Sequence, residues 1–383
     1  MSDVVLLVMS GGARASALER LVAEAREAAV QDTVERALTA PAIGRIVVAT
    51  DSQVLADRLK GLPVEVDLDA PGEPFHFGRR LAGCIERHQM RRVLYMGGGS
   101  GVLLTGEELD GIARLVAGPE PRLVVNNFFS VDFAAWTPAD CLVGLPLPDR
   151  DNALGWLLGQ DPVRRGGILP TIALEKRAAT QFDIDTPLDL LLVRSHSAVG
   201  PHLRRYLAQM NLDAPHLERA WPCLADKQAE VVFAGRIAAE TWAFLERKTA
   251  CRTRVFAEER GMRADGRLAR GAVCSLLGLL MAEIGVKEGF KALAYLGDAA
   301  FVDSRVLWAH FGRWPAPQER YLSDLGRADE IEDEWLREFT LAAFRAPIPI
   351  VLGGHSLVSG GLYALLESKG LAETPSGFAN APS

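Results

Sequence analysis

The sequence has few of the features that assign a protein to a broad class at once. Its five cysteines are odd in number and far apart, at Cys84, Cys141, Cys223, Cys251 and Cys274. That spacing indicates neither a disulfide framework nor a zinc ribbon, so each cysteine is interpreted as a small buried hydrophobe. The longest apolar run, residues 271–282, is far shorter than the roughly 20 residues that a membrane-spanning helix needs. The first residues also lack the basic flank and long apolar core of a signal peptide.

An excess of positive charge is missing as well. The chain has 42 lysines and arginines against 49 aspartates and glutamates, which gives a net charge of -7. Nonspecific binding to nucleic acid or to an anionic membrane needs clustered basic residues. We therefore expect a cytoplasmic protein with small-molecule partners, no nucleic acid and no membrane, and the sequence leaves its oligomeric state open.

A chain of 383 residues is long enough for two domains. The first half alternates patterns typical of strands with patterns typical of helices, which predicts an α/β fold with a mostly parallel, Rossmann-like sheet and helices on both faces. The expected strands are residues 4–9, 45–50, 64–66, 93–96, 122–125 and 140–143. A further short strand is expected near Gln181, carrying Asp183 and Asp185, before a turn and a helix that begins at Pro187. The expected helices are residues 16–38, 53–59, 78–88 and 107–116.

The second half has a different pattern. Long stretches of helical character are expected at residues 225–248, 268–284 and 330–344. We predict a first domain over residues 1–194 and a mainly helical second domain over residues 195–372. The second domain closes with a strand at residues 347–352 and a glycine-rich turn, and a disordered tail is expected over residues 373–383.

Two glycine-rich turns follow apolar strands in the first half. Gly11 and Gly12 follow the first strand, and residues 97–101 follow the strand at residues 93–96. Ligands of open α/β sheets bind beyond the carboxyl ends of strands, and exposed backbone N–H groups at a helix start suit phosphate. The alternative for Gly11 and Gly12 is an ordinary turn between a strand and a helix.

Four stretches, taken in order, carry a family resemblance. They are VVLLVMSGGAR, DTVERAL with IGRIVVATD, YMGGGSGVLLTGEEL, and FDIDTPLDL. Over residues 4–194 the chain resembles the nucleotidyltransferases of glycosyltransferase-A fold that include molybdenum-cofactor and phospholactate guanylyltransferases. The resemblance implies a glycosyltransferase-A-like fold, an NTP substrate, Mg²⁺ and transfer of a nucleotidyl group to a phosphorylated or acidic small-molecule acceptor.

The chain departs from that family's pattern at two positions. The family has a lysine after the first glycine turn, but the first lysine here is Lys60, so Arg14, Arg20 or Arg26 has to neutralise the phosphates. The family's second glycine turn carries a metal-binding aspartate where this chain has Gly99. Since Mg²⁺ prefers carboxylate oxygens, its site is expected to be weakened or absent. The alternative function is therefore a catalytically degenerate protein that binds a nucleotide or nucleotide sugar as a sensor or scaffold.

The resemblance and the strand pattern together nominate site residues. Arg14, Asp183 and Asp185 are the candidate catalytic residues, and Asp183, Asp185 and Asp132 are the candidate metal ligands. Nucleotide-binding candidates are Gly11, Gly12, Asp51, Gly98, Gly99, Ser100, Asn126 and Asn127. Two alternatives stay open, because Asp185 can instead cap the helix that begins at Pro187, and asparagines after a strand are ordinary turn formers. His76 is a weaker candidate to fold over the cleft.

The second half contributes a polar cluster with no recognised motif. A possible acceptor pocket is formed by Arg263, Asp298, Asp303, Arg305 and His310, and the alternative is a network of structural ion pairs. The turn GGHSLVSGG partly resembles the nucleophile turn of α/β-hydrolases, with Ser356 as nucleophile. That interpretation is disfavoured because Val358 occupies a glycine position and no histidine follows His355.

Overall fold

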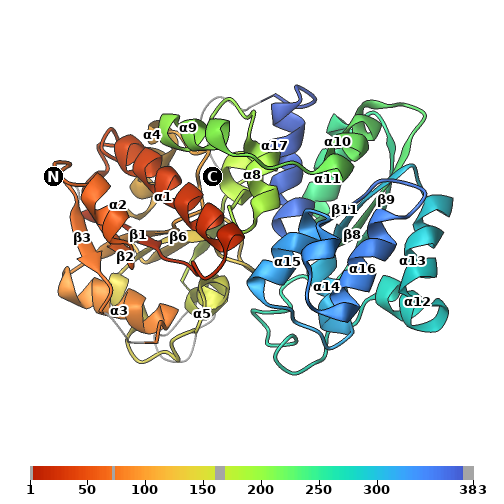
Figure 1. Ribbon diagram of the computed structural model, residues 1–383. Helices are drawn as coiled ribbons and strands as arrows, with labels where there is room; N and C mark the ends of the chain where they lie inside the picture. Colours follow the sequence, from red (N-terminus) through yellow and green to blue (C-terminus); the bar gives the residue numbers. More distant parts are fainter. Residues whose placement is uncertain (1–2, 71–73, 160–168, 374–383) are drawn as a thin grey trace.

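The computed structural model describes residues 3–70, 74–159 and 169–373. Figure 1 shows two sheets, one in each half of the molecule, with helices packed around both and α8 and α17 between them. Among the described residues, no helix is long and apolar enough to cross a membrane.

The first half contains a seven-stranded sheet of order β3-β2-β1-β4-β6-β5-β7. The first four strands are mutually parallel, β6 runs antiparallel to β4 and β5, and β7 is parallel to β5. The strands are β1 Val4–Ser10, β2 Ile43–Thr50, β3 Glu65–Leu68, β4 Arg92–Gly97, β5 Arg122–Val125, β6 Phe133–Thr137 and β7 Thr171–Ala173. The α/β class with a mostly parallel sheet is thus confirmed.

Helices cover both faces of this sheet, because β1 is buried on both sides and its side chains alternate between two cores. Leu6 and Val8 belong to one core, and Leu7 belongs to the other with Leu81 and Leu154. The helices of this half are α1 Ala17–Ala37, α2 Gln53–Arg58, α3 Phe77–Arg87, α4 Gly106–Val116, α5 Leu154–Gly159, α7 Ala178–Gln181 and α8 Pro187–Val193.

Two local expectations in the first half are wrong. The strand expected at residues 140–143 lies earlier, at β6, and Ala139–Leu142 form a short 3-10 helix. The segment before α8 is not a sheet strand either. It makes a single antiparallel bridge between Ser100 and Asp183, and the Ile184 N–H donates to the Gly99 carbonyl at 3.0 Å. Asp183 is therefore placed by the second glycine turn rather than by a strand.

The second half is built on a four-stranded, fully parallel sheet of order β11-β10-β8-β9. Its strands are β8 Glu230–Gly235, β9 Arg252–Ala257, β10 Ala299–Asp303 and β11 Ile350–Gly353. Its helices are α9 Pro201–Gln209, α10 Pro215–Ala220, α11 Ala239–Lys248, α12 Leu276–Ile284, α13 Val286–Ala292, α14 Ser304–His310, α15 Pro317–Asp324, α16 Glu334–Phe344 and α17 Gly360–Ser368.

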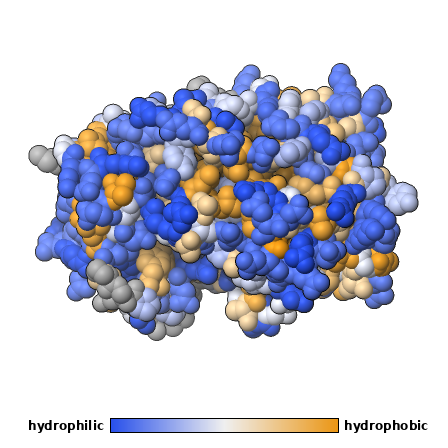
Figure 2. Space-filling view, in the orientation of Figure 1, coloured by the Kyte–Doolittle hydropathy of each residue, from blue (hydrophilic) through white to orange (hydrophobic). Residues whose placement is uncertain are grey.

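Helices outnumber strands in this half, as expected, but three of its four strands were not predicted. The stretch expected as one helix, residues 225–248, divides into β8 and α11. The helix expected from residue 268 begins only at Leu276, after the N-cap Ser275. Figure 2 shows hydrophobic surface at the end of the molecule that carries α12, where Leu276, Leu279 and Leu280 are exposed.

Helices of the second half pack directly against helices of the first half. Helix α9 packs against α1, and α17 packs against α7 and α8. On α1, the Asp32 carboxylate accepts from the backbone N–H groups of His202 and Leu203, both at 2.9 Å. One hydrophobic core includes residues of both sheets, such as Leu6 and Phe301. The two sheets therefore share one packed interior.

Candidate functional site

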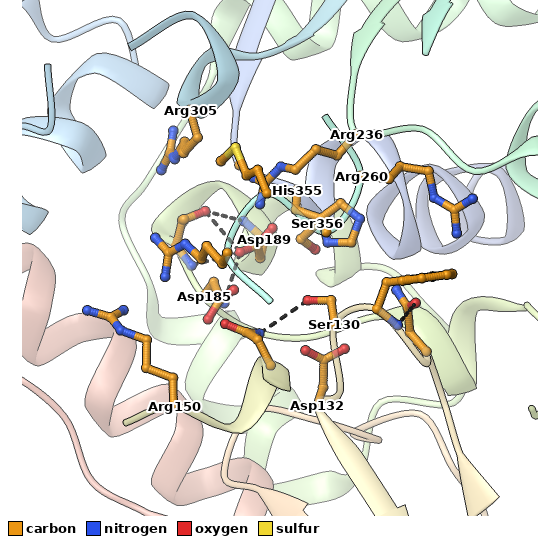
Figure 3. Close-up of a pocket in the computed structure, with 18 of the residues that line it drawn as sticks. Ser130, Asp132, Arg150, Asp185, Asp189, Arg236, Arg260, Arg305, His355 and Ser356 are labelled. Carbon is orange, nitrogen blue, oxygen red and sulfur yellow. Dashed lines mark hydrogen bonds between the residues drawn. The ribbon is translucent and has the colours of Figure 1, made fainter. Parts of the chain in front are cut away.

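Two adjoining cavities lie between the carboxyl ends of the strands and the second half. The larger has a volume of about 1000 Å³ and is lined by the ends of β1, β2 and β4. The smaller has a volume of about 230 Å³ and is lined by both halves (Figure 3). Six residues line both cavities: Arg26, Asp132, Arg150, Asn152, Asp185 and Arg263. A molecule in the larger cavity therefore lies next to one in the smaller.

The glycine turns form one wall of the larger cavity. Gly11 and Gly12 are exposed, and the Gly12 N–H donates to Oδ2 of Asp51 at 3.3 Å. At Gly98 the N–H donates to the Met9 carbonyl at 2.9 Å, and an added Cβ would lie 2.5 Å from Oγ of Ser10. Glycine at residue 98 is therefore needed to bring the two turns together.

Five of the eight nucleotide-binding candidates line this larger cavity: Gly11, Gly12, Asp51, Gly98 and Gly99. Ser100 is buried and donates to the Gly97 carbonyl at 2.9 Å. Asn126 is buried too, and its amide donates to Asp132 at 2.8 Å and to the Thr180 carbonyl at 3.1 Å. These two side chains hold loops in place, whereas Asn127 lines the smaller cavity.

Gly99 has no space for the aspartate of the resembled family. A Cβ there would lie 2.7 Å from the Ile184 carbonyl oxygen, 2.8 Å from Oδ1 of Asp183 and 3.1 Å from Nε of Arg26. Arg26 of α1 donates through Nε to the Ile184 carbonyl at 2.6 Å and through Nη2 to Asp185 at 2.8 Å. The guanidinium of Arg26 is thus held beside Gly99, the position at which the resembled family has a carboxylate.

Of the arginines considered as substitutes for the family's lysine, Arg26 lines the site and Arg14 does not. Arg14 lines neither cavity, because Glu27, a buried carboxylate, holds it in an ion pair of 2.6 Å. Arg20 donates to the backbone carbonyl of Arg14 at 3.1 Å. The sequence analysis considered Arg26 only as one of three possible substitutes for the absent lysine, and it lies six residues after Arg20 on α1.

Aspartates gather around Arg26. Asp132, Asp151, Asp183 and Asp185 line the larger cavity, and Asp151, which precedes α5, was not singled out from the sequence. Burial, and then Asp185, raise the pKa of Asp151 to about 6. Burial, and then neighbouring carboxylates, raise the pKa values of Asp132 and Asp183 well above their usual range. These raised pKa values indicate that nearby positive charge does not fully offset the negative charge of the aspartates.

The fit of Mg²⁺ to these residues is partial. Their oxygen donors and unneutralised charge suit a hard cation. However, within the described parts of the chain, one set of three potential ligands has its atoms within 4.8 Å of one another, and it is Asp32, Glu35 and His202, outside the cavities. The cleft aspartates would supply part of a coordination shell, to be completed by phosphate oxygens and water.

The N-cap of α8 is Thr186 and not Asp185, so the alternative in which Asp185 caps this helix is wrong. Thr186 accepts from the Asp189 N–H, and Asp189 accepts from the Thr186 N–H at 2.7 Å. Burial, and then Asp185, raise the pKa of Asp189 to about 7. Asp185 is exposed and remains directed to Arg26.

Seven arginines line the smaller cavity: Arg26, Arg150, Arg236, Arg260, Arg263, Arg305 and Arg320. The acceptor candidates Arg263 and Arg305 are among them, and Asp303 lies behind Arg236 as its ion-pair partner at 2.5 Å. Asp298 instead accepts from the Glu230 N–H at 2.9 Å, and His310 accepts from the Ser275 N–H at 3.3 Å. These last two do not line either cavity.

The glycine-rich turn after β11 closes one side of the smaller cavity. The Ser356 hydroxyl donates to the Asp183 carbonyl at 3.2 Å, so it supports the aspartate segment and has no histidine partner there. Burial, and then Arg236, lower the pKa of His355 to about 4. His76 is the N-cap of α3, where it accepts from the Arg79 N–H at 3.3 Å, and it pairs with Asp149.

Comparisons with known proteins give structural matches only. No family model matches the sequence, and no curated protein does. A nucleotidyl transferase from Methanothermobacter thermautotroptrophicus matches with 17% identity and a TM-score of 0.40, over 53% of this chain and 98% of its own. A cytidylyltransferase from Leptospira borgpetersenii matches with 14% identity and a TM-score of 0.38, over 56% of this chain and 100% of its own. Matches with TM-scores in this range say nothing about activity.

Proposed function

We propose that the protein binds a nucleoside triphosphate in the larger cavity and transfers its nucleotidyl group to an anionic small molecule in the smaller one. The observation that carries this proposal is the shared boundary of the two cavities, where Arg26, Arg150 and Arg263 meet Asp132 and Asp185. Transfer requires the two reacting groups to be held side by side, and adjoining cavities provide that arrangement.

The larger cavity has the features that a triphosphate needs. The exposed turn of Gly11 and Gly12 lies at the end of β1, before α1, and backbone N–H groups of such turns bind phosphate oxygens. The Gly12 N–H donates to Asp51 at 3.3 Å, so a phosphate oxygen would have to replace that contact. Next to this turn, Gly97, Gly98 and Gly99 contribute backbone rather than side chains to the cavity wall. The base and sugar would extend along the part of the cavity that Phe75 and Phe77 line.

The residues at the boundary would act on the phosphate that is attacked. Arg26 is fixed in orientation by its hydrogen bonds to Ile184 and Asp185, so its positive charge needs no reorganisation during reaction. Arg150 and Arg263 line the same boundary, and their charge would offset the negative charge that develops on the transferred phosphate. A bound Mg²⁺ would supply further charge through the aspartates.

Nucleotide binding without transfer is the second candidate, and the geometry at Gly99 favours it. Because no carboxylate fits there, the site lacks one metal ligand of the resembled family and has Arg26 close by. Such a protein would keep the cavity and the fold while acting as a sensor or scaffold.

Calorimetric titration with each of the four common NTPs, with and without Mg²⁺, tests binding, and pyrophosphate release with anionic acceptors tests transfer. We expect one NTP to bind and pyrophosphate to appear only when an acceptor is present. Asp132→Asn should reduce release by at least about tenfold, the effect of roughly 1.4 kcal/mol. Asp57→Asn, on the exposed surface of α2, is the matched control and should leave release unchanged.

The outcomes separate the two candidates. Binding of an NTP without pyrophosphate release from any acceptor would support the sensor or scaffold. If no NTP binds at any Mg²⁺ concentration, both candidates fail.

A further inference from the structure

The second sheet has a ligand crevice of its own. From β8 the chain crosses to β9 on one side, and after β9 it returns to β10 on the other side of β8. In an open parallel sheet, such a reversal leaves a crevice at the carboxyl ends of the two central strands, and ligands bind there. Arg236 directly follows β8, and Asp303 ends β10. Because Arg236 and residues that follow β10 and β11 line the smaller cavity, that cavity occupies this crevice.

Part of the positive charge in the crevice is already neutralised. Arg236 donates to Asp303 with two nitrogens, at 2.5 and 3.0 Å. Arg305 also uses two nitrogens, and its Nη2 donates to Asp324 at 2.7 Å. Asp303, Asp324 and Arg305 are buried, so these two pairs form a rigid base for the cavity.

Three further arginines in the crevice lie over aromatic rings, although Asp185 lines the same cavity and is near enough to Arg263 to oppose the lowering of its pKa. Arg263 lies 4.9 Å and Arg320 lies 5.4 Å from the Trp314 ring centre, and Arg260 lies 5.4 Å from that of Phe129. Within residues 3–70, 74–159 and 169–373, none of the three forms a recorded ion pair with a carboxylate. Aromatic faces orient guanidinium groups while leaving their N–H edges available. Arg320 uses its Nη1 to donate to the Pro315 carbonyl at 2.9 Å, and its remaining N–H groups are available.

The electrostatics of the crevice agree with this geometry. Burial, and then Arg236 and Arg150, lower the pKa of Arg263 to about 10. Burial, and then Arg305, lower the pKa of Arg320 as well. Positive groups repel one another here, and a bound anion would relieve that repulsion.

We propose that this crevice binds a small-molecule phosphate monoester, with Arg260, Arg263 and Arg320 on the phosphate, and that it does so without nucleotide. Identifying that ligand as the acceptor rests on the proposed function. Three unpaired guanidiniums offer more donors than the two oxygens of one carboxylate accept, whereas a phosphate monoester offers three terminal oxygens and close to two charges. The volume of about 230 Å³ suits a small metabolite.

Calorimetric titration of the full chain, without nucleotide, tests this site. The probes are glycerol 3-phosphate, malate and lactate, which separate a phosphate monoester from a dicarboxylate and a monocarboxylate. We expect glycerol 3-phosphate to bind most tightly, and Arg263→Gln to weaken it by at least about tenfold, as expected for loss of a charged hydrogen bond. Arg313→Gln is the matched control, since Arg313 also lies over an indole, that of Trp335, but lines neither cavity.

A second variant guards against a folding defect. Arg260 is exposed, so Arg260→Gln should fold normally and weaken binding too. The proposal is overturned if malate or lactate binds as tightly as glycerol 3-phosphate, if none of the three binds, or if Arg313→Gln weakens binding as much as Arg263→Gln. Phosphate binding without any pyrophosphate release would leave this site standing and remove the transfer reaction. Pyrophosphate release that occurs only with an acceptor lacking phosphate would support the transfer reaction and overturn the phosphate site.

Discussion

At Gly99, the contact that excludes a side chain involves backbone as well as side-chain atoms. Because the Ile184 carbonyl oxygen would lie 2.7 Å from an added Cβ, and because it is held by Arg26, Gly99→Ala forces the aspartate segment to shift. We expect the variant to lose about 1–3 kcal/mol of unfolding free energy, the usual range for overpacking. Urea denaturation measures this loss.

Gly118→Ala is the control for that substitution, since no atom lies within 4 Å of its added Cβ. It should change the unfolding free energy by less than about 0.5 kcal/mol. Equal stability of Gly99→Ala and the wild type would show that the turn has more space than these contacts indicate.

The sequence predicted the position of this turn but not which side chains surround it. A short apolar strand followed by glycines indicates a site at a sheet edge, and Gly98 and Gly99 do line the cavity. The sequence did not predict that Arg26 occupies the space beside Gly99, because this arginine belongs to α1, far away in the chain. Asp151 was missed because it begins a 3-10 helix of only three residues, which is too short to show a periodic pattern.

At the scale of elements, α9 begins on a carboxylate of another helix. Both oxygens of Asp32 accept N–H groups from the first turn of α9, so Asp32 does the work of an N-cap residue from α1. Asp32→Ala should lower the unfolding free energy by about 1–2 kcal/mol in urea denaturation, because the N–H groups of His202 and Leu203 lose their partner. Asp57→Ala, at an exposed surface pair, should have almost no effect. A similar loss in both variants would remove Asp32 as a cap.

The elements of the first half were more predictable than those of the second. Strand β1 is short, continuous in apolar residues and followed by glycine, which distinguishes it from a helix. Strand β8 is also continuously apolar, but it stands between helical stretches, and periodicity alone does not separate a buried strand from a buried helix. Three strands of the second sheet were therefore missed, although Arg263 and Arg305, which were nominated for an acceptor pocket, do line the smaller cavity.

For the whole molecule, the shared core predicts one cooperative unfolding transition. Side chains from both sheets pack in one hydrophobic cluster, and α17 packs against α7 and α8 of the first half. Scanning calorimetry should give a single peak whose calorimetric and van't Hoff enthalpies agree. Two separated peaks would show that the halves unfold independently.

The acidic cluster should make the unliganded protein less stable at alkaline pH. The raised pKa values of Asp132, Asp151 and Asp189 mean that the folded state binds these protons more tightly than the unfolded state. Their contribution is present below the unfolded value near 4 and is lost as pH rises through about 6–7 and beyond. The lowered pKa of His355 acts in the opposite direction, but only below about pH 7.

Urea denaturation at about pH 7 and about pH 8.5, at low ionic strength, should therefore show a fall in the free energy of unfolding. Asp132→Asn should reduce that fall, because it removes one of the repelling charges. The surface variant Asp57→Asn should keep it unchanged. A wild-type stability that rises over this interval would contradict the arrangement of charges described for the cleft.

The segment from Gln181 to Asp185 is held from both sides. Ser100 and Gly99 contact it from the first half, and Ser356 and the Tyr321 hydroxyl, at 3.0 Å from the Asp185 carbonyl, contact it from the second. Gly360 approaches Gln181 so closely that an added Cβ would lie 2.0 Å from its carbonyl oxygen. Recombination that exchanged either half for that of a distant homologue would leave this segment with one mismatched wall, so we expect the two halves to have been inherited together.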